Sequence, residues 1–153
     1  MLVLLTACSN EDGGTTGASG ATGGASAATG GAPSVAVTLQ EYAIVPSPTS
    51  VPAGGVTFTV TNQGPDEVHE FVVRKTDLAV DALRTKSDGS AIEEGAGITP
   101  VDEIEDIAVG STQTLTVSLD AGSHVLICNI VAKVNGEKVS HYHQGMRAAL
   151  TVT

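Results

Sequence analysis

Apolar and polar residues alternate with a period of two in several short stretches between residues 34 and 153. This spacing predicts β-strands with one buried face, because successive side chains of a strand point to opposite sides of a sheet. The alternating residues form three groups: Val35, Val37 and Leu39; Val56, Phe58 and Val60; and Leu115, Val117 and Leu119. Residues 125–128 are continuously apolar instead, which predicts a strand buried on both faces.

Turn-forming residues separate these predicted strands. Pro, Gly, Asn and Asp occur at residues 46–48, 52–55, 62–65 and 120–122, and residues 148–152 supply a last apolar strand. Short strands with frequent turns indicate an all-β fold. We therefore expect an antiparallel β-sandwich over residues 34–153.

One region departs from the strand pattern. Residues 77–83 have the spacing of a short helix, with Thr76 or Asp77 as its N-terminal cap. Residues 93–106 are acidic and contain Gly, and we expect a crossover loop there that leads the chain to the other sheet. The acidic side chains are interpreted as a solvated surface.

Composition divides the chain into two parts. Residues 13–32 are all Gly, Ala, Ser or Thr, which offer too little apolar surface to offset the entropy lost on ordering. Residues 9–33 are therefore interpreted as a flexible tether, followed by one domain over residues 34–153. The chain has a net charge of −10 and no Trp, so nucleic acid is not an expected partner.

The N-terminus, residues 1–8, resembles the end of a bacterial lipoprotein signal. It is apolar, ends in small residues and is followed by Cys8. In that family the chain is cut before the cysteine, which then carries lipid; the resemblance implies lipidation of Cys8 and anchoring outside the cytoplasm. The segment is shorter than a secretory signal, so we expect the start codon to lie upstream. The alternative is an incidental apolar terminus.

Side chains that bind soft metals concentrate near the C-terminus, with His69 upstream. They are Cys128, His141, His143 and Met146. Thiolate and thioether groups favour soft metals, and imidazole binds several transition metals. An unpaired cysteine in an exported protein is exposed to oxidation, and metal ligation would explain Cys128. The alternative is a buried, inert thiol.

Several motifs follow one another in a specific order. They are Val51-Pro52-Ala53-Gly54-Gly55-Val56-Thr57-Phe58, Asn62-Gln63-Gly64, His69-Glu70-Phe71-Val72-Val73, Gly122-Ser123-His124-Val125-Leu126-Ile127-Cys128-Asn129-Ile130, His141-Tyr142 and Gly145-Met146. Together they resemble the cupredoxins, the blue-copper family of plastocyanin and azurin, over nearly all of residues 34–153. The resemblance implies a Greek-key β-sandwich that binds one copper ion near one end.

The resemblance also implies the metal ligands. Carried over to this sequence, they are His69, Cys128, His141 and Met146. His143 is the alternative to His141, because the family uses both a five-residue and a shorter spacing to the methionine. If His141 binds, His143 would lie at the loop surface, where an exposed imidazole could pass electrons. His124, where relatives often carry an aromatic residue, is interpreted as structural.

This chain departs from the family between Cys128 and His141. Twelve residues separate them, whereas the family usually has two to four. Residues 132–139 carry Asn135-Gly136 at their centre, which predicts a two-residue β-hairpin. The hairpin would bring Val131 and Ser140 together, so we expect it to project beside the site while the ligands converge.

Together, the two resemblances imply a type 1 copper electron-transfer protein tethered to the outside of the cell membrane. We expect a monomer with a redox partner, and a basic face on that partner if the acidic surface steers the encounter. No enzyme is expected, because four protein ligands leave no open coordination position. Two alternatives remain: a lipoprotein for copper capture or delivery without redox turnover, and a metal-free interaction module.

Overall fold

The computed structural model describes residues 31–153. The expected lipoprotein segment with Cys8, and the expected tether up to residue 30, lie outside the described residues. Within residues 31–153, no helix is long and apolar enough to cross a membrane.

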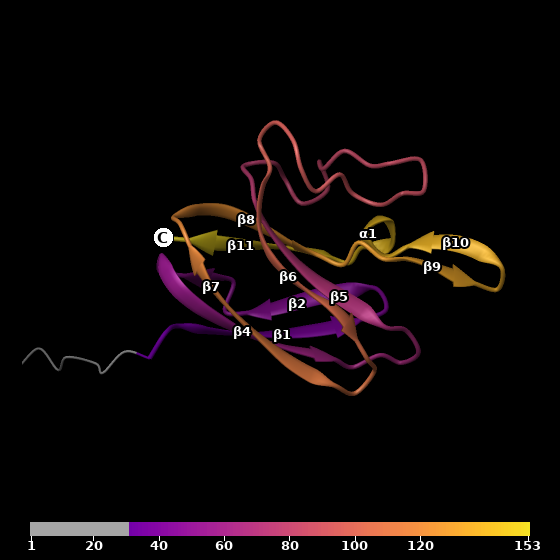
Figure 1. Cartoon of the computed structure of the whole chain (residues 1–153), viewed down its shortest axis with the longest axis horizontal. Helices are drawn as coiled ribbons and strands as arrows, with labels where there is room; N and C mark the ends of the chain where they lie inside the picture. The colour runs from indigo at the N-terminus through magenta and orange to yellow at the C-terminus, as the bar shows by residue number, and fades with distance from the viewer. Residues whose placement is uncertain (1–30) are drawn as a thin grey trace, which may run out of the picture.

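Two β-sheets pack face to face and form a sandwich (Figure 1). In the first, the order is β2 (Ala43–Ser47), β1 (Ser34–Gln40), β4 (Gly54–Asn62) and β7 (Thr112–Leu119). In the second, the order is β3 (Ser50–Val51), β11 (Arg147–Val152), β8 (Gly122–Ile127), β5 (His69–Lys75) and β6 (Thr99–Ile107). The expected all-β sandwich is confirmed.

Two strand pairs are parallel, so the expectation of a purely antiparallel sandwich is wrong there. Val35 of β1 lies opposite Phe58 of the parallel strand β4, and Val51 of β3 lies opposite Val152 of β11. The chain turns from β1 into β2, crosses to the second sheet as β3 and returns to the first sheet as β4, on the other side of β1. The alternation of apolar and polar residues is the same in parallel and antiparallel strands, so it could not predict the parallel pairs.

The core lies between the sheets, where the predicted inward residues of β1 and β4 are buried. The rings of Phe58 and Phe71 join the two layers, with centroids 5.1 Å apart. Burying a side chain of this kind contributes about 1.5–3 kcal/mol. On β7, Leu119 is buried, whereas Leu115 and Val117 are only half-buried because β7 lies at a sheet edge.

The predicted hairpin is present. Strands β9 (Val131–Val134) and β10 (Glu137–Ser140) pair with each other in a separate two-stranded sheet. Asn135 and Gly136 form the turn with φ angles of 52° and 87°, the left-handed conformations that such a turn requires. Ser140 lies opposite Val131, as expected, and the hairpin projects from the end of the sandwich (Figure 1).

Residues 76–98, which we call the outer segment, form no helix, so the helix expected at residues 77–83 is wrong. The Thr76 hydroxyl accepts a hydrogen bond from the Leu78 amide at 3.2 Å, a local turn that competes with helix formation. Leu83 and Ala91 are instead buried in a second, smaller apolar cluster with Tyr142.

The crossover loop expected at residues 93–106 is also wrong over most of its length. Residues from Thr99 onward form β6, an edge strand of the second sheet. Its charged side chains protect an exposed sheet edge from pairing with other chains. Acidic composition therefore concealed a strand here.

The chain termini of the described residues and the hairpin lie at opposite ends of the sandwich. Pro33 and Thr153 lie at one end, where the Thr57 amide donates to Pro33 and the Ala53 amide donates to Thr153. The hairpin and the only helix of the described residues, α1 (His141–Gln144), lie at the other end (Figure 1).

Candidate metal centre

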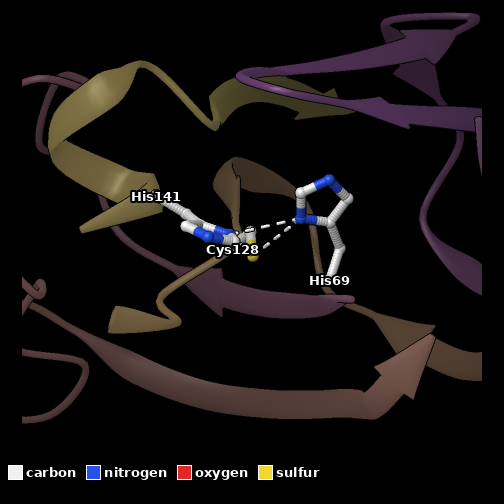
Figure 2. A group of neighbouring side chains, drawn as sticks. All are labelled: His69, Cys128 and His141. Atoms are coloured by element: carbon white, nitrogen blue, oxygen red, sulfur yellow. Dashed lines mark hydrogen bonds between the residues drawn. The ribbon is translucent and has the colours of Figure 1, made fainter. Parts of the chain in front are cut away.

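Three fully buried side chains meet at the hairpin end of the sandwich. His69 is the first residue of β5 and shares its inward face with Phe71, as predicted. Cys128 directly follows β8, and His141 is the first residue of α1. Figure 2 shows the two imidazole rings beside the sulfur.

The potential ligand atoms of these side chains converge. His69 Nδ1 and His141 Nδ1 lie 3.2 Å apart. Cys128 Sγ lies 3.3 Å from His141 Nδ1 and 3.8 Å from His69 Nδ1 (Figure 2). One ion can reach all three atoms, because metal–nitrogen and metal–sulfur bonds are about 2.0–2.3 Å long.

Met146 is fixed next to these residues by the backbone. Its amide donates to the His141 carbonyl at 3.0 Å, and its carbonyl accepts from the Cys128 amide at 3.1 Å. The side chain is buried in the same core as Cys128. Gly145 precedes it at φ 125° and ends α1, and a Cβ atom there would lie 3.2 Å from the Tyr42 carbonyl oxygen.

The two remaining histidines of the described chain lie outside this group. His143 is exposed on α1, so the structure brings His141 rather than His143 to Cys128. His124 is buried in β8 and its Nδ1 lies 3.3 Å from the Gly122 carbonyl. That contact agrees with the interpretation of His124 as structural.

No protein-family model and no curated protein matches this sequence. Solved structures do match. Dithionite-reduced auracyanin from the photosynthetic bacterium Roseiflexus castenholzii is 22% identical with a TM-score of 0.56, and the match covers 81% of this chain and 99% of that one. Auracyanin B is 22% identical with a TM-score of 0.52, covering 80% and 89%.

A methionine-to-glutamine variant of rusticyanin is 16% identical with a TM-score of 0.51, covering 80% of each chain. The fold is that of the cupredoxins. This confirms the fold that the sequence resemblance implied. At these identities the likeness concerns the fold, and the ligand set rests on the geometry above.

In this cupredoxin fold, the sulfur of Cys128 is buried away from solvent. Burial raises the pKa of the Cys128 thiol to about 12, against the smaller opposing effect of nearby backbone N–H groups. One of these is the Glu70 amide, 3.4 Å from the sulfur. The thiol of the metal-free protein is therefore protonated at neutral pH, and a bound metal would replace the proton.

Two carboxylates lie behind the imidazoles of this candidate metal centre. Glu41 Oε1 is 3.5 Å from His69 Nε2, and Glu67 Oε2 is 2.7 Å from His141 Nε2. Burial lowers the pKa of both histidines, and the neighbouring carboxylates oppose this only in part. Sequence reasoning missed Glu41 and Glu67, because they come from different loops and form no spacing motif.

The residue after Cys128 attaches the outer segment to the site. Asn129 accepts a hydrogen bond from the Ala91 amide at 2.6 Å and donates one to the Ala91 carbonyl at 3.0 Å. It also donates to Glu93, which pairs with the buried Arg74 at 2.5 Å. The Asn129 amide itself donates to the Glu70 carboxylate at 2.7 Å. No sequence signal predicted this network.

Proposed function

We propose that the protein is a type 1 copper electron carrier. Its ligands are His69, Cys128, His141 and Met146. The observation that carries this proposal is the convergence of two Nδ1 atoms and one sulfur, 3.2–3.8 Å apart, on fully buried side chains of a cupredoxin fold. This donor set suits both oxidation states of copper.

The chain contributes a fixed environment for the ion. His69 begins an interior strand of the five-stranded sheet, Cys128 directly follows a buried strand, and Met146 is held by backbone hydrogen bonds. Copper supplies one-electron redox chemistry when bound. Side chains that are already in place change little between the two states, which favours fast electron transfer. The dithionite-reduced auracyanin shares the fold, and this supports a redox role here.

Complete burial of the ligands favours a carrier over a copper-delivery protein. Handing the ion to another protein needs access to the ligands, whereas an electron can pass through a covered site. The two functions differ in kinetics. A carrier shows fast electron self-exchange and keeps its ion, whereas a delivery protein readily transfers Cu(I) to an acceptor chelator. Four protein ligands also argue against catalysis at the metal.

The test is copper loading of the purified domain. We expect an intense visible thiolate-to-copper absorption band and the matching paramagnetic-resonance spectrum, both lost in Cys128→Ser and in His141→Ala. His143→Ala, an exposed histidine three positions before Met146, is the matched control and should keep both. A colourless protein that holds only Cu(I), or one that prefers zinc, would contradict the proposal.

We further propose that Cys8 carries lipid and tethers the domain to the outside of the bacterial membrane, where it meets its redox partner as a monomer. The support is the apolar segment before Cys8 and the Gly, Ala, Ser and Thr residues after it. Expression from the full reading frame with a labelled fatty acid should label the protein, and Cys8→Ser should abolish the label and release the protein from the membrane fraction.

A further inference from the structure

We propose that Glu41 and Glu67 are positioning residues of the metal site, which hold His69 and His141 with the Nδ1 lone pairs facing Cys128. The metal's identity in this inference rests on the proposed function. The orientation of the two rings does not, and it can be tested without metal.

The first support is placement. Each histidine side chain is fully buried, and among the described residues the one carboxylate beside its Nε2 is largely buried too, with 11% of the Glu41 side chain and 19% of the Glu67 side chain exposed. Buried carboxylates are costly unless they are paired, and a ring nitrogen is one of the partners within reach of each. One carboxylate therefore serves each imidazole.

The second support is that both carboxylates are themselves held in place. Glu41 Oε1 accepts the Glu67 amide at 2.7 Å and the Asp66 amide at 3.2 Å. The Glu67 carbonyl accepts from the Asn62 side chain at 2.8 Å, and Glu67 Oε2 lies 3.3 Å from the Tyr42 hydroxyl. These bonds join the two glutamates into one unit, which distinguishes them from mobile surface carboxylates.

The third support is a set of buried atoms without a hydrogen-bond partner. His69 Nε2, His141 Nε2 and Glu41 Oε2 all belong to it, although Glu67 Oε2 is within hydrogen-bond distance of His141 Nε2. The 2.7 Å between Glu67 and His141 permits a hydrogen bond, and the 3.5 Å between Glu41 and His69 is at the upper limit for one. Leaving such buried groups unpaired costs about 1–3 kcal/mol each, which favours pairing of each ring nitrogen with its neighbouring carboxylate.

The proton positions follow from this arrangement. A neutral imidazole has one N–H and one lone pair, and a carboxylate beside Nε2 requires the proton on that nitrogen. Nδ1 of each ring then carries a lone pair. Two Nδ1 lone pairs 3.2 Å apart repel each other, and a cation bound between them and the sulfur of Cys128 would relieve this repulsion. Carboxylate–histidine–metal triads orient ligands in the same way.

The two carboxylates also place negative charge behind the ligands. Negative charge stabilises Cu(II) more than Cu(I), because the interaction grows with the charge of the ion. Glu41 and Glu67 therefore favour the oxidised state. Removing either charge should weaken Cu(II) binding more than Cu(I) binding and raise the reduction potential.

The metal-free test uses long-range ¹H–¹⁵N spectra of the imidazoles, which distinguish the two neutral tautomers. We expect the Nε2–H tautomer for both His69 and His141. In Glu67→Ala, the Nε2–H fraction of His141 should fall. Asp120→Asn removes the same charge from the turn before β8, and in this variant the Nε2–H fractions of His69 and His141 should both be unchanged. An Nδ1–H tautomer in the wild-type protein would overturn the proposal.

The copper test compares Glu67→Gln and Glu41→Gln with Asp120→Asn. Glutamine keeps an acceptor oxygen and removes only the charge. We expect Cu(II) affinity to fall about 10–100-fold, as for other groups that orient metal ligands. If Cu(I) affinity is unchanged, the potential rises by about 59 mV for each tenfold loss. A Cu(II)-to-Cu(I) affinity ratio equal to that of Asp120→Asn would overturn the charge effect.

The two proposals can fail separately. A wild-type protein that takes up no copper would overturn the proposed function, and the tautomer spectra would still decide the role of Glu41 and Glu67. A copper protein with the expected colour, in which Glu67→Ala leaves the His141 tautomer unchanged, would overturn the positioning role alone.

Discussion

The hairpin and the outer segment both adjoin the candidate metal centre, but they are joined to the fold in opposite ways. The hairpin is regular, with β9 and β10 paired only to each other. The outer segment has no regular structure beyond isolated bridges, yet it buries Leu83 and Ala91 and binds Asn129 and Arg74 through side chains. Regular hydrogen bonding and integration into the core are therefore separate properties. Four measurements test this contrast.

Among the substitutions, Asn129→Ala should have the largest effect. It removes the partner of both backbone groups of Ala91 and leaves them buried and unsatisfied. Each such group costs about 1–3 kcal/mol, so we expect a loss of about 3 kcal/mol in the free energy of unfolding. Urea unfolding of the metal-free protein measures it, with the exposed Gln144→Ala as control. A loss below about 1 kcal/mol would mean that other contacts hold the outer segment.

Alkaline pH tests whether the fold around Cys128 excludes water. The folded-state pKa of the thiol is raised from 9.0 to about 12. Above pH 9 the unfolded chain loses this proton and the folded chain keeps it, so stability should fall by about 1.4 kcal/mol per pH unit up to about pH 12. Below pH 9 this group has no effect.

The comparison that isolates the thiol is the difference in unfolding free energy between the wild-type protein and Cys128→Ser at each pH. Asn129→Ala should reduce the fall in stability above pH 9, because Asn129 directly follows Cys128 and holds the outer segment there. A shortened hairpin should leave this fall unchanged. Parallel pH profiles for wild type and Cys128→Ser would show that the thiol is accessible to water.

Tyr142→Phe should have a smaller effect. Its hydroxyl donates to the Val80 carbonyl at 2.7 Å and ties α1 to the outer segment. Losing one hydrogen bond costs about 1 kcal/mol. The expected result is that loss in thermal or urea unfolding, with no change for the neighbouring exposed His143→Ala. Equal losses of stability in Tyr142→Phe and His143→Ala would show that this hydrogen bond does not stabilise the contact between α1 and the outer segment.

Shortening the hairpin should have the smallest effect. Ala132 lies opposite Val139, so Asn135-Gly136 can join them directly when Lys133, Val134, Glu137 and Lys138 are removed. We expect a change in stability below about 0.5 kcal/mol, since loop closure depends weakly on length. The copper spectrum should be unchanged. Loss of all copper binding would instead show that the hairpin builds the site.

The features that the sequence predicted are those with local causes. The Asn135-Gly136 turn, the alternating strands and the inward face of His69 all follow from a few adjacent residues. The order of the ligand motifs pointed to His69, Cys128, His141 and Met146, and the geometry brings them together. Cys8 and most of the tether fall before residue 31 and stay predictions.

The features that it missed depend on residues distant in the chain. The parallel pairing of β1 with β4 is decided by where the chain crosses between sheets. The outer segment is shaped by Asn129, 31 residues beyond its last residue at 98, whereas the spacing within its residues 77–83 predicted a helix. Glu41 and Glu67 meet the histidines only in the folded protein. Side-chain contacts of this range leave no periodic signal.

The position of Pro33 and Thr153 gives the molecule a polarity. The start of β1, which follows Pro33, and the C-terminus both lie at the end of the sandwich opposite α1 and the hairpin (Figure 1). An attachment made directly at residues 31–33 would therefore hold the domain by the end opposite α1. An electrode coupled at these residues should exchange electrons with the proposed copper site more slowly than one coupled through a cysteine placed in the hairpin.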